Sequence, residues 1–386
     1  MQTLYVETPQ ALDALAESLR GSPWLALDTE FIREKTFRPQ LCLIQVSNGT
    51  VSACVDPLAI ADLTPLLDLI YDPAITKVMH AGHQDLEIFL GLRGELPRPV
   101  FDTQLAATVL GYGDQVGYGA LVRQVLGVEL DKAHTRTDWM QRPLDPEQLE
   151  YAADDVVQLG PLYLRLVEQL EAKGRRDWLD EDFAALTDPR TYCTPPDEAW
   201  LRIKGAGKLK GMQLAALRAL TGWREAQAIA LDKPRRWILK DEILVELARQ
   251  LPDSLGKLGR VRGLETGTAA RHGATLVELI AGAKRLPAAE WPVLDLAERL
   301  SASEEAVVDL LTALVRQLGA DQGVSPAAIA GRRDLEQLVL GNTDLPLLHG
   351  WRGVLVGHTL RAVVAGEATV RVCKGRLLLE AATQAP

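Results

Sequence analysis

Apolar residues in the first 187 positions form short runs that alternate with segments of helical periodicity. Four runs are strand-like and cover residues 24–29, 41–47, 51–55 and 77–80. The gaps between the first three runs are short, which favours antiparallel neighbours. Helical spacing follows Thr8 and recurs at 82–91, 103–110, 117–126 and 145–171. The pattern predicts an α/β unit.

Proline marks the end of this unit, because Pro189, Pro195 and Pro196 interrupt a polar stretch that we interpret as a linker. The chain beyond it is mainly helical, with a joint expected at Leu286 to Pro292. Near the C-terminus, two strand-like runs flank Lys374-Gly375-Arg376 and are compatible with a hairpin, although a tail without a partner fits equally well. The predicted segments are 1–187, 188–199, 200–285, 290–365 and 366–386.

The two helical segments carry a faint internal repeat. The ten-residue spacing from Arg224 to Pro234 recurs from Arg316 to Pro326. The second copy is more diverged and has alanines where an arginine pair follows Pro234 in the first. This difference weakens the case for nucleic-acid contact by the second copy.

Charge is distributed unevenly along the chain. The formal net charge of the 386 residues is −10, but it divides into −16 for residues 1–199, +9 for 200–285 and −3 for 286–386. A basic segment beside an acidic one is compatible with phosphate capture by the basic module, although a run of charge is usually a solvated face.

Cysteine usage and hydropathy favour a cytoplasmic protein without a membrane segment. The cysteines are scattered, without a Cys-x-x-Cys pair, which fits a reducing compartment; they are Cys42, Cys54, Cys193 and Cys373. The N-terminus lacks a basic region followed by an apolar core, and no apolar stretch approaches 18 residues.

Acidic residues at the ends of predicted elements are the candidate chemistry. Asp28 and Glu30 follow a buried strand and share one face because strand side chains alternate. Tyr151 and Asp155 are four apart in a helical stretch and share a face as well. Together with Asp85 they suggest a two-metal phosphodiester-cleaving site, since Mg²⁺ and Mn²⁺ prefer oxygen ligands.

These residues resemble the DEDD exonuclease superfamily in its tyrosine form, because Glu150 stands where the histidine form needs a histidine. The longer context is similar to the ribonuclease D family over nearly the whole chain: Lys132, then Asp138-Trp-Met-Gln-Arg142-Pro-Leu144, then Tyr151-Ala-Ala-Asp-Asp155. Leu231-Asp-Lys-Pro234 and the residues after it look like the small helical HRDC domain shared with RecQ-type helicases.

The resemblance implies a ribonuclease-H-like mixed sheet flanked by helices, followed by two HRDC-like helical domains. It implies two divalent metal ions: Asp28, Glu30 and Asp155 would hold the nucleophile-side metal, Asp28 would also bridge to the second metal, and Asp85 would approach that metal through water. Tyr151 would orient the attacking water. It also implies 3′→5′ cleavage of RNA ends, with tRNA precursors as substrates.

Other polar residues near the motifs have simpler interpretations. Asp154 points about 100° away from Asp155 around a helix and is expected at the surface or behind the site. Asp102 precedes a helix and is expected to cap it. His80 and His83 lack the spacing of metal ligands and are expected to be core or supporting residues.

Basic residues in loops are the candidates for phosphate contact. They are Lys132 and Arg142 before the Tyr151 helix, and Lys208, Lys210, Arg235, Arg236, Lys257, Arg260 and Arg262 in the basic segment. For the first two, the simpler interpretation is a surface loop. Trp237 could stack on a base, but its apolar neighbours favour burial in the core.

The sequence therefore predicts a metal-dependent 3′→5′ exoribonuclease that releases nucleoside 5′-monophosphates. A DNA 3′ exonuclease of repair type is the alternative enzyme, since the same site serves both sugars. A catalytically silent nucleic-acid-binding scaffold is the alternative from another class, but a scaffold has no reason to keep repelling carboxylates together.

Overall fold

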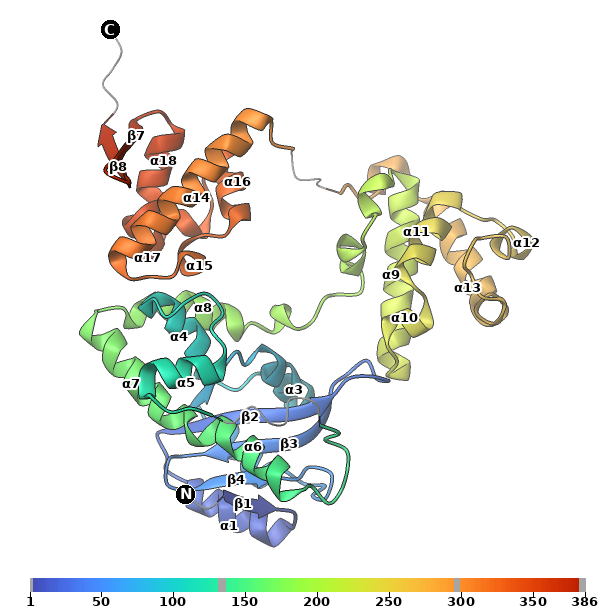
Figure 1. Ribbon diagram of the computed structural model, residues 1–386. Helices are drawn as coiled ribbons and strands as arrows, with labels where there is room; N and C mark the ends of the chain where they lie inside the picture. The colour runs from blue at the N-terminus through green and yellow to red at the C-terminus, as the bar shows by residue number, and fades with distance from the viewer. Residues whose placement is uncertain (1–2, 131–136, 295–298, 382–386) are drawn as a thin grey trace. The chain divides into compact units, whose positions relative to one another are not determined.

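The computed structural model describes residues 3–130, 137–294 and 299–381. The chain divides into two compact units (Figure 1). The first contains Met1–Glu30, Leu41–Asp188 and Glu298–Pro386, and the second contains Phe31–Gln40 and Pro189–Ala297. Within the described ranges, no helix has both the length and the apolar character needed to cross a bilayer.

A six-stranded mixed sheet organises the first unit. Its order is β1-β4-β3-β2-β5-β6, and the strands are β1 (Thr3–Val6), β2 (Trp24–Ile32), β3 (Gln40–Ser47), β4 (Ser52–Val55), β5 (Thr76–Met79) and β6 (Val100–Asp102). β3 and β4 are antiparallel, whereas β1 pairs with β4, and β5 with β2 and β6, in parallel. The predicted mixed α/β fold is confirmed. The sequence pattern missed β1 and β6, because four and three residues are too few to show a period.

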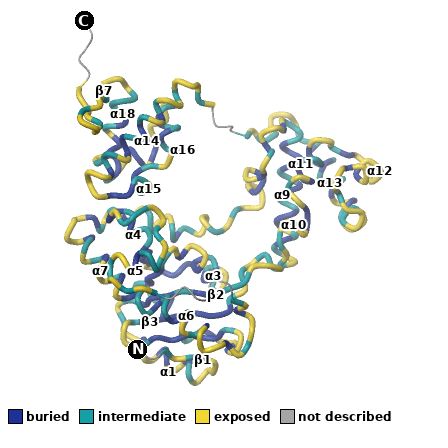
Figure 2. Tube along the Cα trace, viewed as in Figure 1, coloured by how far each residue is buried: buried dark blue, intermediate teal, exposed yellow. Residues whose placement is uncertain are grey.

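Helices cover this sheet, and their bounds are α1 (Pro9–Leu19), α2 (Thr64–Ile70), α3 (His83–Arg93), α4 (Thr103–Leu110), α5 (Tyr118–Leu126), α6 (Pro146–Val157), α7 (Leu159–Ala172) and α8 (Asp180–Leu186). Ala26, Val78 and Phe101 of three strands share a buried core with α4, α5 and α7 (Figure 2). The single helix expected at 145–171 is divided into α6 and α7 at Gln158.

Two helix caps position the elements that carry the candidate site. The Asp102 carboxylate accepts hydrogen bonds from the backbone N–H groups of Gln104 and Leu105, which confirms the predicted cap of α4. It also accepts from the N–H groups of Ala81 and Gly82, and so fixes the turn before α3. Asp145 and Gln148 form a capping box at the start of α6. These bonds set where α3 and α6 begin.

A C-terminal helical bundle belongs to the first unit. It contains α14 (Ala302–Gln322), α15 (Pro326–Ile329), α16 (Arg332–Val339), α17 (Gly350–Arg352) and α18 (His358–Val364), and the antiparallel hairpin β7 (Ala368–Cys373) and β8 (Arg376–Ala381) follows. The Trp178 and Trp351 rings stack with centroids 4.4 Å apart, and a guanidinium covers each outer face, from Arg175 and Arg352. This four-layer stack joins the bundle to the segment after α7.

The second unit is helical, with α9 (Met212–Leu231), α10 (Arg235–Ile238), α11 (Asp241–Gln250), α12 (Leu255–Leu258) and α13 (Thr266–Arg285) around one apolar core. The repeat seen in the sequence has a structural counterpart. A long helix, α9 or α14, ends at a residue in the left-handed conformation, Asp232 or Gly323, and a short helix follows in both cases.

Truncation of Trp351 tests whether the bundle is a structural part of the first unit. Trp351→Ala removes one ring of the stack and the bond from its indole N–H to the Trp178 carbonyl. We expect the free energy of unfolding of the full chain to fall by about 2 kcal/mol, measured by urea denaturation. Val354→Ala is the control, because Val354 is 79% exposed and its truncation should change stability by less than about 0.5 kcal/mol. An equal effect of both variants would contradict this role.

Candidate active site

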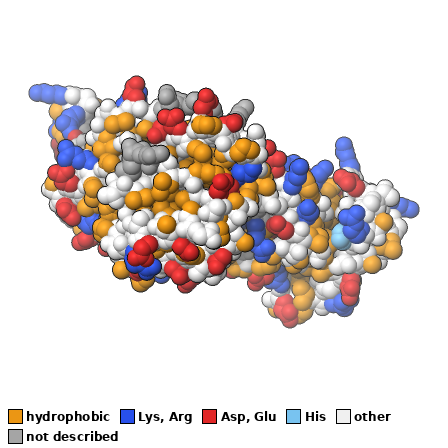
Figure 3. Space-filling model, turned by 90° about the horizontal axis from the view of Figure 1, so that it is seen from below, with side chains coloured by type: hydrophobic (Ala, Val, Ile, Leu, Met, Phe, Trp, Pro, Cys, Tyr) orange, Lys and Arg blue, Asp and Glu red, His pale blue; other side chains and the backbone are white. Residues whose placement is uncertain are grey.

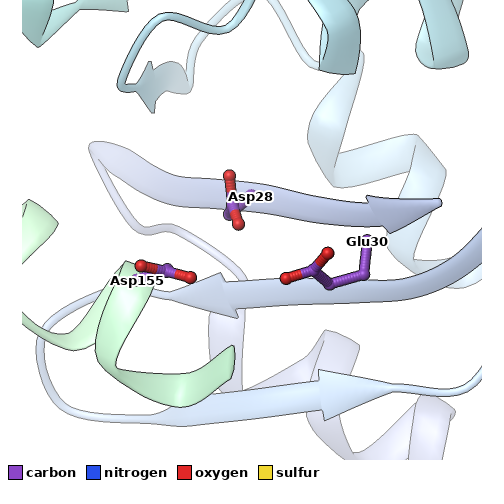
Figure 4. A group of neighbouring side chains, drawn as sticks. All are labelled: Asp28, Glu30 and Asp155. Carbon is purple, nitrogen blue, oxygen red and sulfur yellow. The ribbon is translucent and has the colours of Figure 1, made fainter. Parts of the chain in front are cut away.

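Three carboxylates converge where β2 faces α6. Asp28 and Glu30 project from the same face of β2, and Asp155 reaches them from α6 (Figure 4). One oxygen from each lies within 4.8 Å of the others, so the group could hold a metal ion. The predicted alternation along the strand and the four-residue helical spacing place these side chains as expected.

The electrostatics of this group fit an oxygen-liganded divalent cation. Burial first, and then the neighbouring carboxylates, raise the pKa of Asp28 well above its ordinary value, that of Glu30 to about 8 and that of Asp155 to about 7. Without a cation, the protein therefore holds these groups partly protonated near neutral pH. A divalent cation would compensate the repulsion, and hard carboxylate oxygens are the ligands that Mg²⁺ and Mn²⁺ prefer.

Asp85 lies outside the group of three and has its own support. It is buried in the first turn of α3, and the Thr29 hydroxyl donates a 2.5 Å hydrogen bond to its carboxylate. Burial raises the pKa of Asp85 to about 6, although the Thr29 bond opposes this shift. Its charge in turn raises the pKa of Asp28 and Glu30, so it belongs to the same electrostatic cluster.

Tyr151 stands on α6 one turn before Asp155, and its ring stacks on Trp139 with centroids 6.4 Å apart. Burial and the carboxylates of Asp155, Glu30 and Asp28 raise the pKa of Tyr151 to about 12. The hydroxyl consequently stays protonated at neutral pH and can donate a hydrogen bond.

Three supporting residues were not identified from the sequence: Thr29, Tyr118 and Trp139. The Tyr118 hydroxyl donates a 3.0 Å hydrogen bond to the Asp154 carbonyl on α6, and its ring packs against His80, as expected of a supporting histidine. Thr29 stands between Asp28 and Glu30, and Trp139 lies in the segment 138–144 that resembles ribonuclease D, so the sequence position of both could have identified them. Tyr118 carried none, because its contact with α6 spans 36 residues.

The predicted basic residues fall into different environments. Lys132 lies outside the described residues. The Arg142 guanidinium forms two bonds with the Asp56 carboxylate, at 2.6 and 2.9 Å, and binds three backbone carbonyls, which gives it a structural role before α6. The remaining candidates are exposed: Lys208, Lys210, Arg235, Arg236, Lys257, Arg260 and Arg262.

The expected burial of Trp237 is wrong. Its side chain is 58% exposed, whereas the next two residues, Ile238 and Leu239, enter the core instead. The apolar run therefore does enter the core, but α10 is a single turn and directs its first apolar residue outward.

Comparison with protein families agrees with this arrangement. The family model described as 3′-5′ exonuclease matches residues 4–171, and that of the HRDC domain matches residues 213–280. The mixed sheet with its converging carboxylates thus defines a 3′→5′ exonuclease of the divalent-metal-dependent class.

Relatives narrow this class to one family. Ribonuclease D of Gluconacetobacter diazotrophicus is 41% identical, with 95% of this chain and 94% of the relative covered. Ribonuclease D of Acidiphilium cryptum is also 41% identical, with 97% and 96% covered. The crystal structure of Escherichia coli RNase D, described as an exoribonuclease involved in structured RNA processing, superposes with a TM-score of 0.84 at 36% identity and covers 95% of this chain and 99% of that one. The chain belongs to the ribonuclease D family of 3′→5′ exoribonucleases.

The raised pKa values predict how stability responds to pH and metal. A carboxyl whose folded pKa exceeds its unfolded pKa stabilises the fold at low pH, and this contribution is lost as pH rises. In EDTA we therefore expect the melting temperature to fall between about pH 5 and pH 8, the window set by ordinary carboxyl values and the pKa of about 8 for Glu30. Mg²⁺ should raise it at pH 8.

Asp28→Asn provides the control for this measurement. Loss of one repelling charge should make the metal-free variant at least as stable as the parent at pH 8, and its response to Mg²⁺ should shrink. Differential scanning fluorimetry over pH and Mg²⁺ checks both statements. A Mg²⁺ response equal to that of the parent would contradict a role for Asp28 as a ligand.

Proposed function

We propose that this protein shortens RNA from the 3′ end by hydrolysis, releases nucleoside 5′-monophosphates, uses two divalent ions (Mg²⁺ or Mn²⁺), and acts on tRNA precursors in the cytoplasm. The observation that carries the proposal is the convergence of Asp28, Glu30 and Asp155 within 4.8 Å of one another. Structured RNA processing by the E. coli relative supports the substrate class.

Different residues of the site would bind the metals, support the ligands and orient the attacking water. Asp28, Glu30 and Asp155 would hold metal. Asp85, on α3, would add a fourth negative charge next to them. Bound divalent ions would acidify the attacking water and compensate charge on the phosphate and on the leaving oxygen. The Thr29 hydroxyl keeps Asp85 in place through its hydrogen bond. The protonated Tyr151 hydroxyl can orient the attacking water, and Trp139 holds its ring in position.

Positive charge in the second unit suits capture of the RNA body. Residues 200–285 have a net charge of +9. On the face shown in Figure 3, Lys and Arg side chains are frequent over the right-hand part of the molecule. We include six exposed basic candidates of that unit in the proposed RNA-binding surface: Lys208, Lys210, Arg236, Lys257, Arg260 and Arg262. We leave out Arg142 and Arg235, because the buried carboxylates of Asp56 and Glu225 already compensate their charges.

Neutralising each carboxylate tests the proposal. Asp28→Asn, Glu30→Gln, Asp85→Asn and Asp155→Asn should each lower single-turnover cleavage of a 5′-labelled RNA by more than about 100-fold, because each removes charge that holds or surrounds the metals. Asp154→Asn is the matched control, since it removes the same charge next to Asp155 on α6, from a position about 100° around the helix and outside the group of three. Its rate should stay within a few-fold of the parent. A matched DNA strand tests the choice of sugar, and cleavage of DNA in preference to RNA would overturn the assignment of substrate.

Tyr151→Phe separates water positioning from metal binding. The variant keeps the ring and its stack on Trp139 but loses the hydroxyl. We expect the rate to fall by about 10- to 100-fold while the affinity for Mn²⁺, measured by calorimetry, stays unchanged. Either an unchanged rate or a lost affinity would contradict the assigned role.

A further inference from the structure

A groove of about 1100 Å³ lies within the second unit. One side comes from the connection between β2 and β3, residues 31–40, and the other from α10 and the start of α11. The assigned catalytic residues Asp28, Glu30, Asp85 and Asp155 are not among the residues that line it. The groove is therefore separate from the group of catalytic carboxylates.

Buried ion pairs make the α10 side of this groove rigid. The Arg224 guanidinium, 3% exposed, binds the carboxylates of Glu225 and Asp241 and the Leu239 carbonyl. Glu225, 2% exposed, also accepts a 2.6 Å hydrogen bond from Arg235. The charges of this network are mutually compensated, so they build the wall and do not act as a recognition surface.

The opposite side is held to this wall by specific contacts. The Asp232 carboxylate, at the end of α9, accepts hydrogen bonds from the backbone N–H groups of Phe37 and Arg38, at 3.1 and 3.0 Å. The Arg235 guanidinium lies 4.6 Å from the centroid of the Phe37 ring. The groove is thus preorganised from two segments that are almost 200 residues apart in the chain, as the 195-residue separation of Phe37 and Asp232 shows.

Trp237 presents an aromatic surface on this groove. It lines the groove and is 58% exposed. The Lys233 ammonium lies 5.9 Å from the ring centroid. A large apolar side chain left this exposed is unfavourable in water and has the geometry of a stacking platform.

Uncompensated cations line the same groove. Arg202 and Arg236 are exposed and form no ion pair within the part of the chain that the structure describes. The Lys240 ammonium lies 4.0 Å from a carboxylate oxygen of Glu265, at the limit of an ion pair. An aromatic face beside uncompensated guanidinium groups is the combination that binds single-stranded nucleic acid, where bases stack and phosphates need positive charge.

We propose that this groove binds an unpaired segment of the RNA substrate, with a base stacked on Trp237 and the flanking phosphates on Arg202 and Arg236. The inference rests on the proposed function and specifies where that RNA is held. An unpaired segment is favoured over duplex RNA because the faces of paired bases are already stacked on their neighbours.

Binding of an unstructured 12-nucleotide RNA to the full-length protein in EDTA tests the groove without cleavage. Trp237→Ala should weaken the affinity about tenfold, and Trp237→Phe should restore most of it. Arg236→Gln should weaken binding and reduce the slope of log affinity against log salt by about 0.7. Leu255→Ala and Arg285→Gln are matched controls, because both residues are exposed in the same unit and neither lines the groove.

A photocrosslink gives a second readout. RNA that carries 5-iodouridine should crosslink to Trp237, identified by mass spectrometry, and duplex RNA of the same length should not. Unchanged affinity of Trp237→Ala, or duplex binding with the same sensitivity to Trp237, would overturn the proposal. Cleavage by the parent protein in Mg²⁺ tests the proposed function separately. If the parent cleaves no RNA, the proposed function fails, whatever the binding measurements show for the groove.

Discussion

Electrostatic repulsion among Asp28, Glu30, Asp85 and Asp155 is the constraint on which the nuclease part depends. Burial raises the pKa of all four carboxyls, and repulsion from other members of the group raises the pKa of Asp28, Glu30 and Asp155 further. The fold therefore stabilises an arrangement that these side chains would not adopt alone. Packing and hydrogen bonds around the acids supply the free energy that offsets this cost. Buried apolar residues of β2 hold Asp28 and Glu30. The Asp102 carboxylate fixes the turn before α3, which carries Asp85, and a capping box begins α6, which carries Asp155.

Aromatic and hydroxyl groups around the acids preserve this arrangement. Thr29 holds Asp85, Trp139 supports Tyr151, and Tyr118 binds the backbone of α6 beside Asp155. Such supporting contacts matter because a metal site tolerates little error in the direction of its ligands. The acids would be poorly oriented without them.

The two helical segments differ in their physical roles. In the C-terminal bundle, the stack around Trp178 and Trp351 and the pairs of Arg352 with Glu181 and Asp182 bury aromatic and charged groups within the first unit. In the segment that matches the HRDC family model, arginines and Trp237 remain at the surface. The bundle contributes to the structure of the nuclease unit, whereas the segment that matches the HRDC model has the groups suited to RNA.

The sequence alone determined the α/β class and the set of acids, because both are encoded locally. Alternation along β2 places Asp28 and Glu30 on one face, and a four-residue spacing places Tyr151 and Asp155 on another. Tertiary structure decided the features that depend on distant partners. The short strands β1 and β6 form because they pair with β4 and β5. Arg142 forms an ion pair with Asp56, which is 86 residues away in the chain. The exposure of Trp237 depends on how α10 packs, which no local pattern of apolar residues specifies.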